Sequence, residues 1–297
     1  MKKENSSKIV MALAMSIFGT LAPFVRNINV SSGELALYRA IMAAMLVGGY
    51  LLVTKQGLSI KEVKKEFLLL LLSGTAMGIN WILLFEAYKY TTVSVATLSY
   101  YFAPVIIMVI CPLLFKEKLS GKQILCFVMS TIGLVLITGT ASGGADDMLG
   151  IIFGIGAAIF YATVVIINKF IKRVTGIHRT FIQFISAIIV LAPYVLLTSG
   201  FNIESLNATG AISLLIVGFF HTGITYCMYF SAFNELPGHK VAVLSYIDPM
   251  VAVLVSVFWL NEGMTLPRLI GGLLILGFTL WSELPAKKKS IRGNKDV

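Results

Sequence analysis

Long apolar runs separated by short polar breaks make up nearly the whole chain. An α-helix needs roughly 20 mostly apolar residues to cross the hydrocarbon core of a bilayer. Cutting the chain at charges, turn residues and polar clusters gives ten candidate runs: 8–26, 34–54, 67–90, 93–115, 121–140, 148–171, 176–199, 209–233, 238–260 and 266–284. The pattern therefore predicts an all-α polytopic membrane protein with ten transmembrane helices.

The composition supports this prediction. Of the 297 residues, 57% are apolar and 13% are charged, whereas an ordinary soluble domain has roughly 45–50% and about 25%. So few charges do not cover a soluble protein of this size, which excludes a soluble globular enzyme. The net charge is +10, but the basic residues lie in short segments at the ends of apolar runs. We therefore expect a lipid bilayer around the chain and no nucleic-acid partner.

The basic residues also predict the orientation. With the N-terminus in the cytoplasm, the inside segments carry 20 Lys and Arg residues, and the outside loops carry only Arg26, Lys89 and Arg268. The positive-inside rule requires such a bias, and one helix more or fewer would scatter it. We therefore expect both termini in the cytoplasm and a multi-pass protein of the cell membrane, with a bacterial inner membrane as the favoured compartment.

Cofactor chemistry is not indicated. Cys111, Cys126 and Cys227 lie inside apolar runs and share no metal-ligand spacing, so they predict neither a disulfide framework nor a metal site. Nothing resembles an ATP-binding P-loop, so we expect an ion gradient or the substrate's own gradient to drive any movement across the membrane.

The chain is doubled. A shift of 145 residues aligns five identities without a gap: Phe85 with Phe230, Ala87 with Ala232, Tyr101 with Tyr246, Pro104 with Pro249 and Glu117 with Glu262. We therefore expect two five-helix repeats, 8–140 and 148–284, followed by a basic cytoplasmic tail, 285–297. Because five is odd, the second repeat enters the membrane from the opposite side, and such inverted repeats are typical of transporters that work by alternating access.

The twin segments resemble a known family. Ala103-Pro104 followed by Lys116-Glu117-Lys118-Leu119-Ser120, and Asp248-Pro249 followed by Asn261-Glu262-Gly263-Met264-Thr265, are similar to the EamA-type domain of the drug/metabolite transporter superfamily. Arg39 resembles that family's arginine in the second helix. The residue before each glutamate, usually glycine in the family, is Lys116 or Asn261. The resemblance implies ten helices, cytoplasmic termini and export or exchange of small metabolites, such as amino acids, nucleobases or small cations.

Ionisable groups inside spans are costly, so each is a candidate for function. Asp248 and His221 fall near the bilayer centre, where they are candidates for binding a polar substrate, and Asp248 is the candidate for carrying a proton. The alternative is structural: Asp248 held neutral by a hydrogen bond, and His221 bonded to a nearby carbonyl. Protons are the candidate coupling ion.

Glu86 and Arg39 lie at matching depth in neighbouring spans. One interpretation is an interior ion pair with a coupling or gating role. The other is that Arg39 extends to the outer headgroups while Glu86 pairs with Lys89 three residues later.

Aromatic and amide side chains complete the candidate substrate site: Asn80, Trp81, Tyr101, Tyr161 and Tyr246. Their rings suit a flat or cationic substrate, although packing is the simpler role for any one ring. The prediction is a secondary transporter of a small polar or amphipathic metabolite. A membrane-embedded enzyme and a non-transporting sensor are the alternatives, and the former has no nucleophile–base or metal motif in its favour. The sequence leaves the choice between monomer and homodimer open.

Overall fold

The computed structural model describes residues 2–115, 120–139, 145–233, 235–236 and 238–284, and these are helical with no strand. The elements before residue 140 are α1 (Lys2–Gly19), α2 (Leu21–Arg26), α3 (Ser32–Val53), α4 (Ile60–Lys65), α5 (Phe67–Tyr90), α6 (Val93–Tyr100), α7 (Ala103–Phe115) and α8 (Gly121–Gly139). Those after it are α9 (Ala145–Phe170), α10 (Gly176–Thr198), the 3₁₀ turn η1 (Ile203–Ser205), α11 (Ala208–Leu215), the π-helix η2 (Ile216–Ile224), α12 (Thr225–Phe233), α13 (Gly238–Ser245), α14 (Ile247–Leu254), the π-helix η3 (Val255–Trp259) and α15 (Leu266–Glu283).

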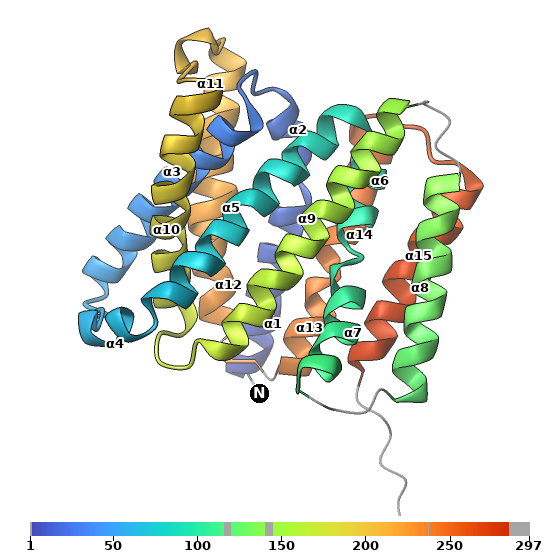
Figure 1. The fold of residues 1–297 in the computed structure, drawn as a ribbon, viewed down its shortest axis with the longest axis horizontal. Coiled ribbons are helices and arrows are strands. Elements are labelled where there is room, and N and C mark those ends of the chain that lie inside the picture. The colour runs from blue at the N-terminus through green and yellow to red at the C-terminus, as the bar shows by residue number, and fades with distance from the viewer. Residues whose placement is uncertain (1, 116–119, 140–144, 234, 237, 285–297) are drawn as a thin grey trace, which may run out of the picture.

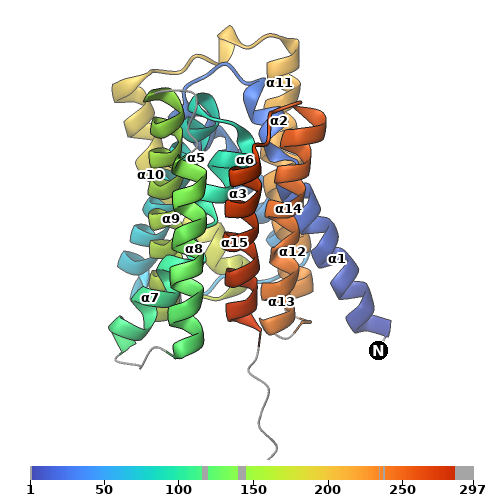
Figure 2. The same cartoon turned by 90° about the vertical axis from the view of Figure 1, so that its right-hand side faces the viewer.

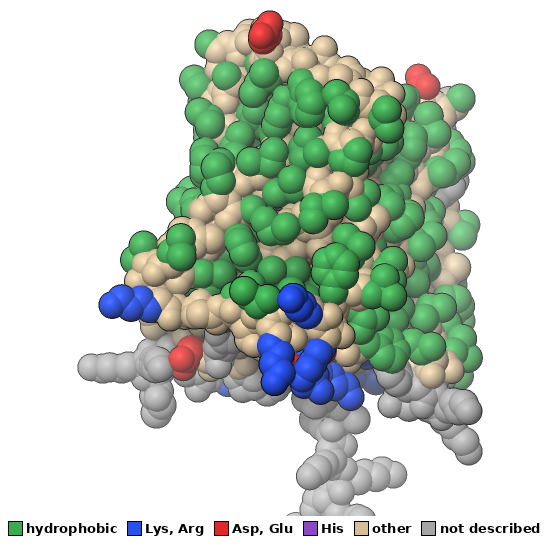
Figure 3. Space-filling model, turned by 60° about the vertical axis from the view of Figure 1, so that its left-hand side comes forward, with side chains coloured by type: hydrophobic (Ala, Val, Ile, Leu, Met, Phe, Trp, Pro, Cys, Tyr) green, Lys and Arg blue, Asp and Glu red, His purple; other side chains and the backbone are tan. Residues whose placement is uncertain are grey.

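The helices run roughly alongside one another between two ends of the molecule (Figure 1). We call the end with the start of α1 the proximal end, and the end with α2 and α11 the distal end. Hydrophobic side chains cover the zone between the two ends, and Lys and Arg side chains gather at the proximal end (Figure 3). This distribution is what a lipid-facing surface requires.

Seven helical stretches of the described chain are long and apolar enough to cross a membrane: Asn5–Arg26, Ser32–Val53, Phe67–Tyr90, Val93–Cys111, Ala145–Phe170, Gly176–Thr198 and Ala208–Phe233. Three shorter apolar helices are Gly121–Ile137, Val243–Trp259 and Leu266–Ser282. The polytopic all-α class is confirmed. The total of ten crossings and the side on which the termini lie stay predictions.

Three prolines interrupt helices at a fixed distance. α1 ends at Gly19, α6 at Tyr100 and α13 at Ser245, each four residues before Pro23, Pro104 or Pro249. A proline ring clashes with the carbonyl of the residue four positions earlier and has no N–H to donate, which accounts for all three breaks. The spans expected at 8–26, 93–115 and 238–260 are therefore broken helices.

Close crossings depend on glycine. A Cβ on Gly133 of α8 would lie 2.6 Å from the Gly271 carbonyl oxygen of α15, and a Cβ on Gly271 would lie 2.5 Å from the Gly133 oxygen. Figure 2 shows α8 and α15 next to each other. Gly74 likewise contacts α10 at Ser186, and Gly154 contacts α6 at Ser99. These small residues let helix backbones pack closely where larger side chains would hold them apart.

Helices from the two parts of the chain are interleaved. α1 packs on α12, α13 and α14, while α9 packs on α5, α6 and α7. α3 contacts η2, and α10 contacts α5. Three further pairs are α3 with α10, α6 with α14 and α8 with α15. With α6 and α7 counted as one span, α13 and α14 as another, and α11, η2 and α12 as a third, exchanging the earlier spans for the later ones in chain order leaves this set of contacts unchanged.

A polar corner at the proximal end was not predicted. The short helix α4 is capped by Ser59, and Glu66 follows it at the start of α5. The Glu66 carboxylate accepts hydrogen bonds of 2.8–3.1 Å from the backbone N–H groups of Lys172, Arg173 and Val174. Burial opposes its ionisation, but these hydrogen bonds outweigh burial and lower the pKa of Glu66 below its ordinary value. The corner ties α5 to the α9–α10 turn.

Asn261 adopts a left-handed backbone with φ of 53°. This is the region that glycine enters freely and that asparagine tolerates better than most residues. The departure from the family's glycine at this position is therefore compatible with the turn that it makes. Lys116 and Glu117, the corresponding residues of the first repeat, lie outside the described residues, as do residue 140 and the tail 285–297.

Candidate functional site

Arg39 lies inside the bundle with 4% of its surface exposed. α3 carries it seven residues beyond Ser32, roughly 10 Å along the helix. Its Nε donates a 2.7 Å hydrogen bond to Thr222 Oγ1 of η2, and its guanidinium carbon lies 4.5 Å from the centre of the Trp81 ring and 5.7 Å from that of Phe85. A cation–π contact with a desolvated tryptophan stabilises this buried charge.

The terminal amino groups of Arg39 have no hydrogen-bond partner among the described residues. A guanidinium presents these groups as a planar fork that matches a carboxylate or phosphate. Arg39 is therefore a candidate for binding an anion inside the bundle.

Asp248 supplies the opposite charge. It lies in the first turn of α14, one residue before Pro249, and accepts a 2.5 Å hydrogen bond from the Tyr101 hydroxyl at the end of α6. Tyr101 and Tyr246, aligned by the repeat, both lie in helix breaks before their prolines. Among the described residues, no hydrogen bond or ion pair joins Asp248 to Arg39, and each has its own partner.

Helix interruptions meet around these groups. A Cβ on Gly19, the last residue of α1, would lie 2.6 Å from the Asp248 carbonyl oxygen, so the breaks after α1 and after α13 touch. The π-helix η2 is marked by the hydroxyl of Thr222, which donates to the carbonyl of Val217 five residues earlier at 2.8 Å. Such π-helical turns are frequent at functional sites because they re-aim side chains.

His221 is buried, with 1% of its surface exposed. Its Nε2 lies 3.0 Å from Thr20 Oγ1, its Nδ1 lies 3.4 Å from the Ile216 carbonyl oxygen, and its ring packs on Phe24. No hydrogen bond joins it to Asp248 in the part of the chain that the structure describes. The sequence placed both residues at one depth, and the structure gives them separate partners. A direct role of His221 in substrate binding stays a prediction.

Glu86 and Arg39 do not form the interior ion pair that was one interpretation of the sequence. The Glu86 carboxylate pairs instead with Lys89 at 3.0 Å, as the alternative interpretation has it. Arg39, however, does not extend to the headgroups, because Thr222 and Trp81 hold it inside. Matching depth along two helices left open which way each side chain points around its helix axis.

The remaining candidate residues of the substrate site have different surroundings. Asn80 donates a 2.7 Å hydrogen bond to the Ala157 carbonyl oxygen and so joins α5 to α9. Tyr161 is 40% exposed, and its ring lies 5.6 Å from that of Tyr100, next to Tyr101. Tyr246 is buried. Within the described residues, no three His, Cys, Asp or Glu side chains come together in a way that would hold a metal.

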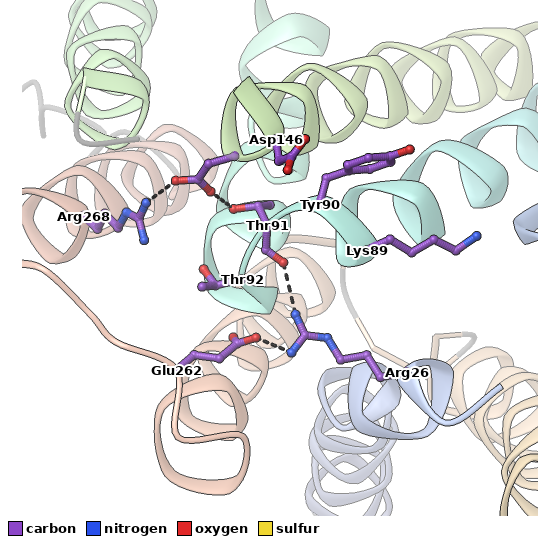
Figure 4. A pocket seen from close by; sticks show the side chains of 9 residues that line it. Arg26, Lys89, Tyr90, Thr91, Thr92, Asp146, Glu262 and Arg268 are labelled. Atoms are coloured by element: carbon purple, nitrogen blue, oxygen red, sulfur yellow. Dashed lines mark hydrogen bonds and ion pairs between the residues drawn. The ribbon is translucent and has the colours of Figure 1, made fainter. Parts of the chain in front are cut away.

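A second polar group closes the distal end, and we call it the distal ion-pair cluster: Arg26, Thr91, Asp147, Ser256, Glu262 and Arg268. All of its members except Ser256 line an open pocket of about 340 Å³, and Figure 4 shows the side chains around this pocket. Arg26 pairs with Glu262, and Arg268 pairs with Asp147. Asp147 also accepts a hydrogen bond from the Thr91 hydroxyl. The cluster fastens α2, the α5–α6 turn, α9 and the start of α15 to one another.

Glu262, expected only as a repeat-motif residue, is central to this cluster. It accepts hydrogen bonds from the Ser256 hydroxyl and, at 2.8 Å, from the Val93 backbone N–H. The sequence placed Arg26 and Arg268 in outer loops but gave no sign of their pairing, because their partners are distant in the chain. Nothing in the sequence indicated that Thr222 would be the hydrogen-bond partner of Arg39.

Fold and site together define a polytopic membrane protein with opposite charges and aromatic rings enclosed among interrupted helices. The model of the EamA-like transporter family matches residues 6–139 and again residues 148–282. The chain belongs to this family, as the resemblance implied, and is a multi-pass protein of the cell membrane and a membrane transporter.

Relatives from several organisms agree with this assignment. An uncharacterized transporter of Bacillus subtilis, YxxF, is 28% identical over 86% of this chain and 82% of its own length. Uncharacterized transporters of Clostridium kluyveri and Archaeoglobus fulgidus are 24% and 27% identical, over 90% and 92% of this chain and 90% and 95% of theirs. A solved crystal structure with 15% sequence identity covers 92% of this chain and 96% of its own with a TM-score of 0.64, which shows a shared fold.

Proposed function

We propose that the protein is a secondary transporter that moves a small zwitterionic metabolite, of the amino-acid kind, by alternating access. The observation that carries this proposal is the Arg39 guanidinium, buried on Trp81 with its terminal amino groups unbonded by the described protein. A carboxylate fits that fork, and Asp248 with the tyrosine hydroxyl of Tyr101 offers the acceptors that an ammonium group needs.

The two halves supply these charges separately. We propose two inverted five-helix repeats, 8–140 and 148–284, ten crossings and both termini in the cytoplasm. The symmetry of the contacts supports the inverted repeat. A pseudo-two-fold axis requires each contact made by the earlier spans to have a counterpart made by the later spans. Arg39 belongs to the first half and Asp248 to the second, so movement between the halves changes their separation.

Asp248 is the proposed coupling group, with export or proton-coupled exchange as the proposed direction. A carboxylate that alternates between the two sides carries a proton in one direction and substrate in the other. Organic cations and nucleobases, which the aromatic rings also suit, are tested in the same assay.

The test is transport in proteoliposomes by wild type and by Asp248→Asn. We expect wild type to accumulate amino acid against its gradient when a pH gradient is applied. Asp248→Asn is expected to lose this accumulation while it still exchanges labelled for unlabelled substrate. If Asp248→Asn accumulates substrate with an unchanged dependence on pH, Asp248 is not the coupling group. Transport of cations or nucleobases in preference to amino acids would overturn the substrate class.

A further inference from the structure

A separate cavity of about 450 Å³ opens at the distal end between α2, the α2–α3 turn, α3 and α5. We call it the distal cavity. Its size is that of a site for a small organic molecule. Its rim carries the exposed residues Arg26, Asn29 and Lys89. Its floor is apolar and buried, and includes Val25, Ile28, Leu35 and Phe85.

Two basic residues, Arg26 and Lys89, lie at the rim of the distal cavity, and no acidic side chain is among the described residues that line it. Their carboxylate partners, Glu262 and Glu86, lie outside this lining. Lys89 has 48% of its side chain exposed and a single hydrogen bond, to Glu86, so two of its three ammonium protons are free to donate. Arg26 uses its two terminal nitrogens on Glu262 and on backbone carbonyls of Tyr88 and Thr91, and its Nε is unused by the described residues.

Ser32 adds a polar group lower in the cavity wall. Its residue surface is 2% exposed, and its hydroxyl has no hydrogen-bond partner in the described part of the chain. The Ser32 oxygen is itself fully buried, so the donors that a ligand in the cavity reaches are those of the rim. Donors at the rim, above an apolar floor, match a molecule with one anionic group and an apolar stem.

We call Arg39, Trp81, Tyr101 and Asp248 the central site. The distal cavity is distinct from it but borders it at Phe85. Phe85 lines the cavity floor, and its ring centre lies 5.7 Å from the guanidinium carbon of Arg39. A molecule in the cavity would therefore contact the phenyl ring that borders the central site without touching Arg39 itself.

We propose that the distal cavity is a second binding site, for a small amphipathic anion, with its anionic group on Lys89 and Arg26 and its stem on the apolar floor. This site does not depend on the transported substrate or on the coupling ion. The same chemistry is offered by a free carboxylate with a short apolar chain or by the head-group end of an anionic lipid.

Binding is measured by calorimetry on the full chain in neutral detergent, with 4-phenylbutyrate as the probe and 4-phenylbutanamide as its uncharged match. We expect the carboxylate to bind at least about tenfold more tightly than the amide, because only the carboxylate forms charge-assisted hydrogen bonds. Equal affinity of the two probes would overturn the proposal, since it would indicate partition into detergent or apolar surface alone.

Substitutions of Lys89 and Glu86 are expected to change the affinity for 4-phenylbutyrate in opposite directions. Lys89→Gln is expected to weaken 4-phenylbutyrate binding about five- to tenfold, whereas Glu86→Gln, which frees Lys89, is expected to strengthen it. Lys172→Gln, an exposed lysine at the proximal end, is the matched control and is expected to leave affinity unchanged. Unchanged affinity in Lys89→Gln, or weakening in Glu86→Gln, would place the anion elsewhere.

The substitution Arg39→Lys distinguishes probe binding in the distal cavity from probe binding at the central site. Probe binding that survives this substitution supports the distal cavity, and binding that is lost with Arg39→Lys but kept with Lys89→Gln assigns the probe to the central site and ends the proposal. Nanodiscs identify the source: competition by phosphatidylglycerol, but not by phosphatidylcholine, supports a lipid head group as the occupant. Binding that is insensitive to phosphatidylglycerol supports a free anion.

Discussion

At the scale of single residues, the central question is why a full positive charge is kept inside the bundle. Burying an unpaired guanidinium is costly, and one neutral hydrogen bond with an aromatic ring offsets only part of that cost. A structural role would be served equally well by an apolar side chain. The charge of Arg39 is therefore best accounted for by an anion that visits it.

Arg39→Lys tests this account. Lysine keeps the positive charge but loses the planar fork and much of the stacking on Trp81. We expect kcat/KM for transport to fall about ten- to a hundredfold, which corresponds to roughly 1.4–2.8 kcal/mol of lost binding to the transition state. Initial rates in proteoliposomes measure it. Arg173→Lys, at an exposed pair with Glu62, is the control and should leave the rate unchanged, and a wild-type rate in Arg39→Lys would exclude the fork.

The candidate site shows where sequence reasoning stops. Arg39, Trp81 and Asp248 could be named because charged and amphipathic side chains are conspicuous in apolar runs. Their partners could not, because Thr222 and Tyr101 meet them across 183 and 147 residues of chain. The depth of a residue along a helix follows from counting residues. The direction of its side chain around the helix axis depends on packing, and at Thr222 it also depends on a π-helical turn that the residue pattern did not predict.

At the scale of elements, the apolar runs predicted where the helices lie but not where they break. Pro23, Pro104 and Pro249 each follow a helix end by four residues, as steric reasoning explains, whereas Pro193 lies inside the continuous helix α10. The π-helices η2 and η3 and the short helix α4 were not predicted either, because no proline or long apolar run marks them. Two of the breaks lie against each other, since a Cβ on Gly19 would lie 2.6 Å from the Asp248 carbonyl oxygen.

Gly19→Ala should disturb that contact. Its Cβ would lie 2.6 Å from the Asp248 carbonyl oxygen and 2.7 Å from Val251 Cβ, so α1 and α14 must separate. We expect a loss of about 1–3 kcal/mol in stability, the range for overpacking a tight interior, together with reduced transport. Gly277→Ala in α15, where a Cβ meets nothing within 4 Å, is the control and should be neutral or slightly stabilising. Thermal unfolding of both variants in detergent measures the difference, and equal midpoints would contradict the packing argument.

The corner at Glu66 predicts a dependence on pH. The pKa of this carboxyl is lower in the folded protein than its ordinary value of 4.5, so it stabilises the fold above that value and loses this contribution as the pH falls through the folded pKa. At pH 7 we expect Glu66→Gln to lower the unfolding midpoint by about 2–6 °C, through loss of charge-assisted hydrogen bonds.

The difference between wild type and Glu66→Gln should shrink on acidification toward pH 4 and below, because wild type then becomes protonated as well. Glu62→Gln, at an exposed ion pair with Arg173, is the matched control and should shift the midpoint little at any pH. A difference for Glu66→Gln that grows as the pH falls has the wrong sign for a carboxylate held by backbone N–H groups.

At the scale of the whole molecule, the alternating access that we propose gives the distal ion-pair cluster a role. Two near-equal halves exchange conformations only if the contacts that close each end are strong enough to hold and weak enough to release. We interpret the distal ion-pair cluster as such a set of contacts, since Arg26–Glu262 and Arg268–Asp147 join α2, α9, α15 and the turn before α15. The cluster is formed in the structure described above.

Removing one charge from the cluster should therefore shift the population toward a state that is open at the distal end. In Glu262→Gln, Arg26 loses its ionic partner. The Glu262 side chain is 9% exposed and that of Arg26 is 32% exposed, so solvent screens the pair and the loss is smaller than for a fully buried pair. We expect a cysteine introduced at Ser94, which is 1% exposed below the cluster, to react about tenfold faster with a membrane-impermeant thiol reagent, in a background without the three native cysteines. Glu86→Gln, which breaks the exposed pair with Lys89 at the same end, should leave that rate unchanged.

If both variants label at the wild-type rate, the cluster holds the fold together but does not gate it. If both accelerate labelling equally, the effect is one of surface charge, because only Glu262 links the two halves of the chain.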